Sequence, residues 1–287
     1  MRKLQSKLRD NSEIDLDDTI NSGQVFLWKK IDSKWYGIDG KKVLILEEKL
    51  GRSCRYTNKF FRLDDDFQKI KNKLSKDKIV NNAIKNFPGM RIMRQDPFQC
   101  FISFIVSSNS SIPNIQTRLQ NLCRIFGEKK KIGKKEFFLF PEPNKLANAA
   151  NRDILRCGLG YRTKYVKKAA IAVENGTIDL LSLKKLDYYD ARNSLCQVFG
   201  IGKKVADCIL LFSLDKLEAI PFDRWVLRIL QKYYSEIFDI TTKSITDKTY
   251  DNLHNISVEH FGKYAGYAQQ FLFKNERENF EKKWLRV

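Results

Sequence analysis

Residues that commonly bind transition metals are scarce in this sequence. It has only two histidines, His254 and His260, and its six cysteines are scattered without a CxxC or any similarly short spacing. Zinc sites and iron–sulfur clusters are usually built from cysteines and histidines that lie close together in the chain. The pattern argues against a metal or iron–sulfur cofactor, and we expect reduced thiols, most of them buried.

Long hydrophobic runs and acidic residues are also in short supply. No apolar segment reaches the roughly 18–20 residues of a membrane span, and residues 1–5 lack the apolar region of a signal peptide. The 34 Asp and Glu are outnumbered by 53 Lys and Arg, which gives a formal net charge of +19. Such an excess is relieved by a polyanion. We therefore expect an intracellular protein that associates with nucleic acid, in the cytoplasm, nucleoid or nucleus depending on its source.

Prolines number only six, and neither a low-complexity linker nor an internal repeat is evident. Short β-rich runs at 25–28, 35–38 and 43–46, separated by turn residues, predict an antiparallel meander. The pattern becomes helical from residue 97, and 98–106 is apolar on nearly all sides, as in a central buried helix. The sequence thus predicts an α+β protein. An N-terminal antiparallel β-sheet domain with helices, residues 1–96, precedes an all-helical part, residues 97–287.

Basic residues cluster around Gly133, at Lys129–Lys131 and at Lys134 and Lys135. Such a run could contact DNA, but charge runs are more often solvated surface. We therefore predict an exposed loop here and do not include it in the candidate site.

The segment at about 190–212 has the pattern of a helix-hairpin-helix. A helix is expected to end near Val198, and a second helix to begin at about Lys203, after Gly200 and Gly202. Two glycines permit positive φ and close approach of the backbone. The free N–H groups of the second helix would then face a phosphate. A DNA-binding hairpin accounts for the basic pair at 203–204 better than an ordinary helical turn does.

Lys204 and Asp223 are the candidate chemical groups. Lys204 falls in the first turn of the second helix, where the helix dipole disfavours a cation. We expect this field to lower the pKa of Lys204 and to make its amine available as a nucleophile. Asp223 follows Ile-Pro-Phe and is a natural N-cap of the next helix. On local pattern alone, a phosphate contact for Lys204 and a simple cap for Asp223 are equally good interpretations.

Five ordered motifs resemble those of the eukaryotic-type 8-oxoguanine DNA glycosylases, which belong to the helix-hairpin-helix-GPD superfamily. The strongest is Gly-Ile-Gly-Lys-Lys-Val-Ala-Asp-Cys at 200–208 followed by Ile-Pro-Phe-Asp at 220–223. The others lie at 21–28, 94–109, 158–162 and 264–273, so the resemblance covers nearly the whole chain. It implies that the helical part is a two-part glycosylase core. It also implies a bifunctional DNA glycosylase/AP lyase whose partner is double-stranded DNA containing 8-oxoguanine, and we expect a monomer.

The resemblance implies that Lys204 is the nucleophile and Asp223 its carboxylate partner. The amine would attack C1′ of the deoxyribose, displace the damaged base and leave a Schiff base. The imine acidifies the neighbouring sugar carbon, so β-elimination would cleave the strand on the 3′ side. Asp223 would stabilise positive charge on the sugar and assist proton movement. This chemistry requires neither a metal nor a redox cofactor.

The resemblance also places four residues around a flipped base: Gly23, Cys208, Gln269 and Phe273. Gln269 and Phe273 are four residues apart, so they share a helix face, with an amide for the Watson–Crick edge and a ring for stacking. Gly23 would offer its carbonyl to N7–H, a donor that 8-oxoguanine has and guanine lacks. For Phe273 and Cys208, an ordinary core position is the alternative.

Contacts to the DNA itself are implied for a second set: Asn109, Tyr161, Arg162, Gly200, Gly202 and Lys203. Asn109 and Tyr161 resemble the residues that enter the vacated base stack, and Arg162 resembles a contact to the estranged base opposite the lesion. Two positions depart from the family pattern. A second opposite-base arginine corresponds to Asn114 here, and a position that is often histidine is Trp225.

From the departure at Asn114 we expect that the enzyme removes 8-oxoguanine opposite cytosine but tolerates other opposite bases more readily than the two-arginine members. The alternative is that a Lys or Arg from another loop replaces the missing contact. Two broader alternatives to the whole interpretation also remain open at this point. One is a glycosylase for another lesion, such as adenine mispairs or alkylated bases, although these monofunctional members usually lack the lysine. The other is a non-catalytic helix-hairpin-helix protein that binds DNA.

Overall fold

Three antiparallel strands follow a short helix at the start of the described chain. The structure, a computed structural model, describes residues 14–47, 54–240 and 245–284. The strands pair in the order β1 (Trp28–Ile31), β2 (Lys34–Asp39) and β3 (Lys42–Glu47). This confirms the predicted antiparallel sheet. The two-residue turn between β2 and β3 includes Gly40, whose φ is +55°.

The middle strand of the sheet, β2, is buried on both faces. Trp35 of β2 points into a small cluster formed with α1 (Leu16–Ile20) and α2 (Arg55–Phe60). Its neighbour Tyr36 points the other way and joins the main core of the helical part. This alternation follows from the two-residue period of a strand. The main core therefore includes side chains from both sides of residue 96, which explains how the sheet and the helices hold a fixed orientation.

Thirteen further α-helices and two further strands of the described residues complete the fold around this sheet. They are α3 (Phe67–Leu74), α4 (Lys78–Asn86), α5 (Pro97–Ser107), α6 (Ile112–Phe126), β4 (Lys129–Ile132), β5 (Lys135–Phe138), α7 (Pro143–Ala147), α8 (Asn151–Leu155), α9 (Thr163–Glu174), α10 (Leu180–Leu183), α11 (Tyr188–Cys196), α12 (Lys203–Ser213), α13 (Arg224–Tyr233) and α14 (Asp247–Phe261), followed by α15 (Ala265–Trp284). The helix α5 has the predicted central position, because its residues 99–106 are all buried.

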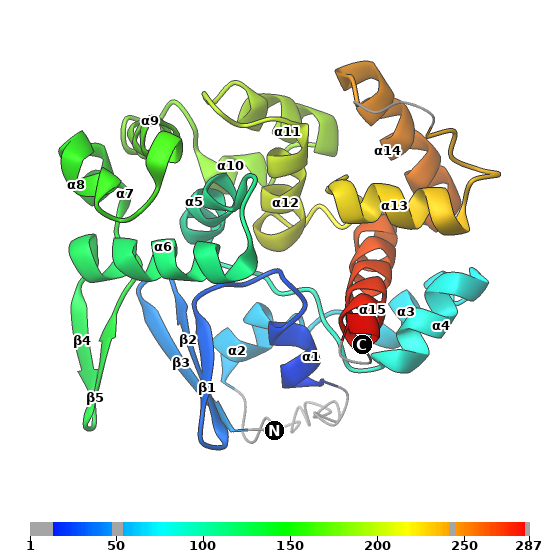
Figure 1. Cartoon of the computed structure of the whole chain (residues 1–287), viewed down its shortest axis with the longest axis horizontal. Helices are drawn as coiled ribbons and strands as arrows, with labels where there is room; N and C mark the ends of the chain where they lie inside the picture. Colours follow the sequence, from blue (N-terminus) through cyan, green and yellow to red (C-terminus); the bar gives the residue numbers. More distant parts are fainter. Residues whose placement is uncertain (1–13, 48–53, 241–244, 285–287) are drawn as a thin grey trace, which may run out of the picture.

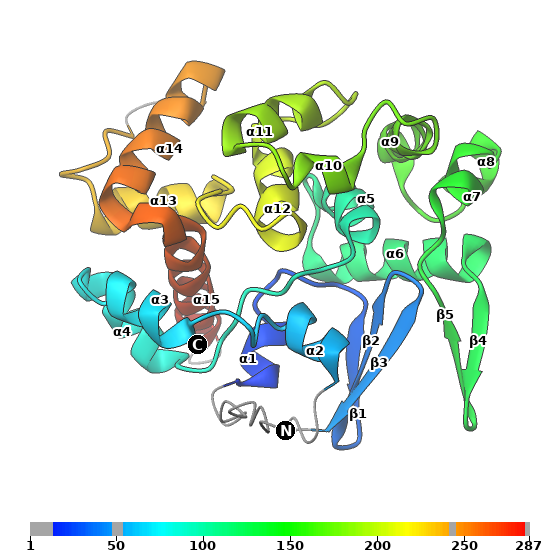
Figure 2. The same cartoon turned by 180° about the vertical axis from the view of Figure 1, so that it is seen from behind.

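The helices form two groups that meet above the sheet (Figure 1). One group contains α5 to α12. The other contains α13, α14 and α15 together with α3 and α4, which come from the N-terminal part of the chain (Figure 2). The long helix α15 packs against α4, α13 and α14. This arrangement agrees with the predicted two-part core, and it shows that α3 and α4 belong to the second group rather than to the sheet. No helix in the described ranges has the length and apolar character needed to cross a bilayer.

The prediction of a loop at the basic run was wrong, and the second part of the chain is not entirely helical. Residues 129–138 form the antiparallel hairpin β4–β5, with Gly133 at φ +58° in its turn. The strand β4 is an exposed run of lysines, so it lacks the alternation of apolar and polar residues that would reveal a strand. The hairpin is held by Phe137 of β5, whose ring stacks on Tyr36 with 5.8 Å between the centroids.

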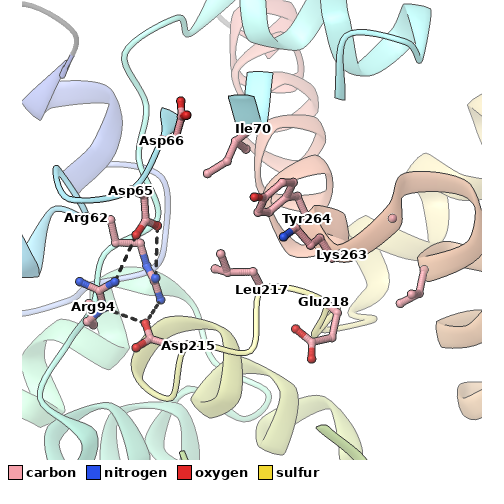
Figure 3. A pocket seen from close by; sticks show the side chains of 12 residues that line it. Arg62, Asp65, Asp66, Ile70, Arg94, Asp215, Leu217, Glu218, Lys263 and Tyr264 are labelled. Carbon is pink, nitrogen blue, oxygen red and sulfur yellow. Dashed lines mark hydrogen bonds and ion pairs between the residues drawn. The ribbon is translucent and has the colours of Figure 1, made fainter. Parts of the chain in front are cut away.

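An ion-pair network fixes the turn after α12 against the N-terminal part (Figure 3). It forms one wall of a pocket of about 820 Å³. The carboxylate of Asp215 accepts from Arg94 Nε at 2.7 Å, and it pairs with Arg62 and with Lys184 Nζ at 2.5 Å. Burial alone would raise the pKa of Asp215, but these three cations lower it to about 2. We therefore interpret these ion pairs as a structural anchor that holds the turn after α12 against the N-terminal part of the chain.

Asp215→Asn tests this anchor. Asparagine accepts the left-handed backbone of Asp215, whose φ is +60°, so the substitution mainly removes charge. A carboxylate with a lowered pKa stabilises the fold above its unfolded pKa of about 4, and that contribution is lost as pH falls towards 2. We expect a loss of about 2–3 kcal/mol in the free energy of unfolding at pH 7, measured by urea denaturation.

The same measurement between pH 4 and pH 2 should show the difference between variant and wild type shrinking. Asp153→Asn, at a surface ion pair with Arg156, serves as the control and should change stability by less than about 0.5 kcal/mol. An effect of Asp215→Asn that does not vary over this pH range would show that the carboxylate charge is not the anchor.

Candidate active site

The predicted hairpin is confirmed between α11 and α12, with only one glycine in the left-handed region. Gly200 has φ +91°, and a Cβ there would lie 2.6 Å from the ring of Tyr165, so both conformation and space require glycine. Gly202 has φ −97° and is the N-cap of α12. No side chain caps this end, and a Cβ on Gly202 would meet nothing within 4 Å. The first amides of α12 are therefore open to an anion.

The side chain of Lys203 is held within the protein. Its ammonium donates to Asp251 Oδ2 at 2.8 Å and to the carbonyl of Asp247 at 2.9 Å. These contacts connect the hairpin to α14. A phosphate contact by this ammonium would have to replace an existing ion pair, so the open groups of the hairpin are its backbone amides.

Lys204, Cys208 and Asp223 converge where α12 and α13 begin. Cys208 is one turn after Lys204 on α12, is buried, and shares a hydrogen bond with its ammonium. The ammonium also lies 6.0 Å from the centroid of the Phe104 ring. Asp223 is the N-cap of α13, as predicted, and its Oδ1 accepts from the amides of Trp225 and Val226, each at 2.9 Å. In the described residues, no hydrogen bond is made to its Oδ2.

The prediction of a lowered pKa for Lys204 was wrong. Burial favours the neutral amine, but the negative charges that Cys208 and Asp223 can carry outweigh it, and the pKa of Lys204 is raised. Burial raises the pKa of Cys208 itself to about 12, so near neutral pH this side chain is a neutral thiol that is hydrogen-bonded to Lys204, and Asp223 supplies the negative charge. Lys204 is therefore an ammonium in the resting protein and must lose a proton before it can act as a nucleophile.

Gly23 and Phe273, two of the residues predicted to surround the base, face each other. Gly23 has φ +86°, and a Cβ there would lie 3.3 Å from Cε1 of Phe273. The segment that contains Gly23 is fixed to α15, because Gln270 Nε2 donates to the carbonyl of Ser22 at 2.8 Å. Gln269 is buried, and its Oε1 has no hydrogen-bond partner in the described structure. Gln269 also lines a small cavity together with Phe222, the residue before Asp223. A buried acceptor without a partner is available to a polar ligand.

A second group of predicted residues gathers at the loop between α5 and α6. Asn109 has φ +49°, and the ring of Tyr161 is 52% exposed. Arg162, at the end of the 3₁₀ helix Gly160–Arg162, donates through Nε to the carbonyl of Ser108 at 2.9 Å and through Nη2 to that of Asn109 at 3.0 Å. The structure thus brings Asn109, Tyr161 and Arg162 together. Tyr161 is placed as an exposed ring available for stacking.

Trp225, the other departure from the family pattern, packs edge-on against Phe280 of α15 with 5.2 Å between the ring centroids. Its indole therefore contributes to the contact between α13 and α15.

Sequence reasoning missed a buried carboxylate next to this centre. Asp207 of α12 accepts from Tyr188 Oη at 2.8 Å and from Tyr250 Oη at 2.6 Å. The hydroxyl of Tyr250 in turn accepts from the amide of Phe222 at 3.4 Å, next to Asp223. Asp207 thereby connects α11, α12 and α14 to the segment that carries Asp223. An acidic residue in an otherwise apolar helix was the available signal, but its partners are 19 and 43 residues away.

Asp207→Asn tests this network through the pH dependence of stability. Burial raises the pKa of Asp207 to about 7, above its unfolded value near 4. Between these values the folded protein binds more protons than the unfolded chain, so this group makes stability fall as pH rises. We expect the free energy of unfolding of the variant, relative to that of the wild type, to increase from pH 4 to pH 7. Asp66→Asn, at an exposed helix cap, should leave the slope unchanged, and equal slopes for Asp207→Asn and wild type would contradict the prediction.

Comparison with known proteins gives a consistent picture over most of the chain. The profile of the 8-oxoguanine DNA glycosylase N-terminal domain matches residues 7–101, and that of the HhH-GPD superfamily of base excision DNA repair proteins matches residues 102–254. The N-glycosylase/DNA lyase OGG1 of Arabidopsis thaliana is 31% identical over 284 residues, covering 92% of this chain and 77% of the relative. A probable N-glycosylase/DNA lyase of Methanothermobacter thermautotrophicus is 29% identical, covering 71% of this chain and 68% of the relative.

Solved structures agree with these matches. The 8-oxoguanine glycosylase/lyase of Clostridium acetobutylicum, in complex with double-stranded DNA containing cytosine opposite 8-oxoguanine, superposes with a TM-score of 0.84 at 30% identity. The match covers 93% of each chain.

Proposed function

The chain belongs to the 8-oxoguanine DNA glycosylases of the HhH-GPD superfamily, and from this premise we propose that it excises 8-oxoguanine from double-stranded DNA with Lys204 and Asp223 as its catalytic groups. The activity is that of a bifunctional DNA glycosylase and lyase. One observation carries the assignment of residues. The buried amine of Lys204 lies with the Cys208 thiol and the Asp223 carboxylate where α12 and α13 begin.

Gly23, Gln269 and Phe273 would bind the damaged base after it leaves the DNA stack. Such enzymes act on a flipped nucleotide, which they recognise by hydrogen bonds and by stacking. Phe273 would stack on the base, and the unpaired Oε1 of buried Gln269 supports a hydrogen bond from the amide to its Watson–Crick edge. The carbonyl of Gly23 would accept from N7–H. Since guanine has no hydrogen on N7, this contact would favour 8-oxoguanine.

The chemistry would begin with loss of a proton from the Lys204 ammonium. The free amine attacks C1′ of the deoxyribose, the glycosidic bond breaks, and the base leaves with the bonding electrons and takes up a proton. The carbon–nitrogen adduct opens the sugar to an imine. Loss of a proton from C2′ then expels the 3′ phosphate by β-elimination. Asp223 would face the positive charge that develops on the sugar, and its Oδ2 is free of hydrogen bonds from described residues.

The DNA would be held by the hairpin amides and by the loop that contains Asn109. The open first turn of α12 suits a backbone phosphate, as does the net charge of +19. Asn109 and the exposed ring of Tyr161 would fill the space that the flipped base leaves. Arg162 would contact the base opposite the lesion.

Lys204→Gln tests the nucleophile. The variant keeps a polar side chain of similar reach but cannot form an imine, so borohydride trapping on 8-oxoguanine DNA should be abolished. Binding of the same DNA should change by less than about tenfold, because the hairpin amides remain. Lys232→Gln, on the surface of α13, is the matched control and should trap as wild type does. Trapping by Lys204→Gln at the wild-type yield would eliminate Lys204 as the nucleophile.

Asp223→Asn separates a catalytic charge from a helix cap. Asparagine still caps α13, so the fold should survive, while single-turnover excision should slow by about 10²-fold or more. Because the Asp223 charge raises the pKa of Lys204, its removal should lower that pKa and shift the pH profile of imine formation to lower pH. Asp187→Asn, at the equivalent cap of α11, is the control. If Asp223→Asn behaves like this control in both rate and profile, Asp223 is only a cap.

A further inference from the structure

A second guanidinium lies at the loop that Arg162 holds. Arg118 of α6 donates through Nη1 to Ser110 Oγ at 2.5 Å and through Nε to the carbonyl of Gly158 at 2.9 Å. Long side chains on a helix point back towards its N-terminus, which explains how Arg118 reaches a loop that precedes α6. Arg118 therefore bridges the 108–110 loop and the segment that leads into Tyr161 and Arg162.

The two arginines come from different elements and form hydrogen bonds with three consecutive residues, 108–110. Arg162 contacts the carbonyls of Ser108 and Asn109, and Arg118 contacts the hydroxyl of Ser110. The residue between these contacts, Asn109, has the left-handed backbone of a sharply turned loop. Both guanidinium groups thus lie at the element that, in the proposed function, enters the DNA.

The partners of Arg118 distinguish it from the structural cations of this protein. Arg94 and Lys203 are held by carboxylates. Arg118 has a hydroxyl and a carbonyl as partners, and no carboxylate in the described ranges forms an ion pair with it. Neutral acceptors compensate its charge weakly, so acceptor atoms on a DNA base can replace them at little electrostatic cost.

We propose that Arg118 is a specificity-determining residue that contacts the base opposite the lesion together with Arg162, and that it favours cytosine. This inference rests on the proposed function. Unpaired cytosine presents O2 and N3, both acceptors, on its Watson–Crick edge. A guanidinium has donors only, in a fixed planar array, so it matches this edge. Thymine and guanine each carry a ring N–H where cytosine has the N3 acceptor, and this donor would face another donor.

The position of Arg118 also bears on the question that the sequence left open. Asn114 is one turn earlier on the same face of α6, nearer to the loop, and it is exposed and neutral. The cation that would compensate for this neutral residue is supplied by the same helix, one turn later, and not by another loop. We therefore expect preference for cytosine and not broad tolerance of the opposite base.

The test is single-turnover excision of 8-oxoguanine opposite C, T, G and A. Arg118→Met should reduce the preference for cytosine by roughly 5- to 150-fold, the range for loss of one specific base contact. Arg124→Met removes the same charge from an exposed position on the same helix and should keep the wild-type ratios. Adding Asn114→Arg to Arg118→Met should restore part of the preference, because it returns a guanidinium to this face.

Arg118→Lys, which keeps the charge but not the planar donors, should give an intermediate preference. Circular dichroism should be used to check that each variant is folded. Two results would overturn the inference and leave Arg118 as a loop anchor only. In one, Arg118→Met has the same ratios of excision rates opposite the four bases as Arg124→Met; in the other, it slows excision equally opposite all four bases. Borohydride trapping opposite cytosine separates this result from failure of the proposed function. Trapping that depends on Lys204 supports the function whatever the ratios, whereas its absence in wild type would overturn both.

Discussion

The position of α12 is the constraint on which the rest of the site depends. Its residues from Val205 to Ser213 are all buried, so the helix cannot shift without disturbing the main core. Only its first turn reaches the surface, and there it presents Lys204 and open amides together. A helix that is fixed at one end and open at the other can hold a reactive amine and a phosphate site in constant relation, which preorganised catalysis requires.

Asp223 is tied to the same helix by a route that does not involve Lys204. The carboxylate of Asp207 binds Tyr250, and Tyr250 contacts the backbone of Phe222. Burying this carboxylate is costly, which its raised pKa reflects, and two tyrosine hydroxyls recover part of that cost. The nucleophile and the carboxylate thus come from α12 and from the segment before α13, and one buried network relates these two elements.

Local signals in the sequence were sufficient for the helix-hairpin-helix, for the Asp223 cap and for the strands β2 and β3, whereas β1 lies three residues later than the run predicted at 25–28. Contacts between distant residues were not predictable. Gly200, the start of α12 and the Asp223 cap depend on backbone geometry within a few residues, so pattern and propensity revealed them. The strand β4 has no apolar alternation and is held by a ring of β5 against the sheet. The raised pKa of Lys204 was missed for a related reason. The helix dipole can be inferred from the sequence. The carboxylate of Asp223, however, lies 19 residues after Lys204 in the chain, and only the fold brings it close to the amine.

The raised pKa of Lys204 fits the electrostatics of the proposed reaction. The Asp223 carboxylate attracts a nearby cation, and in the resting protein the Lys204 ammonium is that cation. After it loses its proton, the sugar acquires positive charge as the glycosidic bond breaks, and the protonated imine carries it afterwards. Asp223 can therefore oppose a positive charge in the resting state, at the sugar and in the covalent intermediate. Its attraction for Lys204 makes the first proton harder to remove, but the same charge is already in place where the transition state needs it.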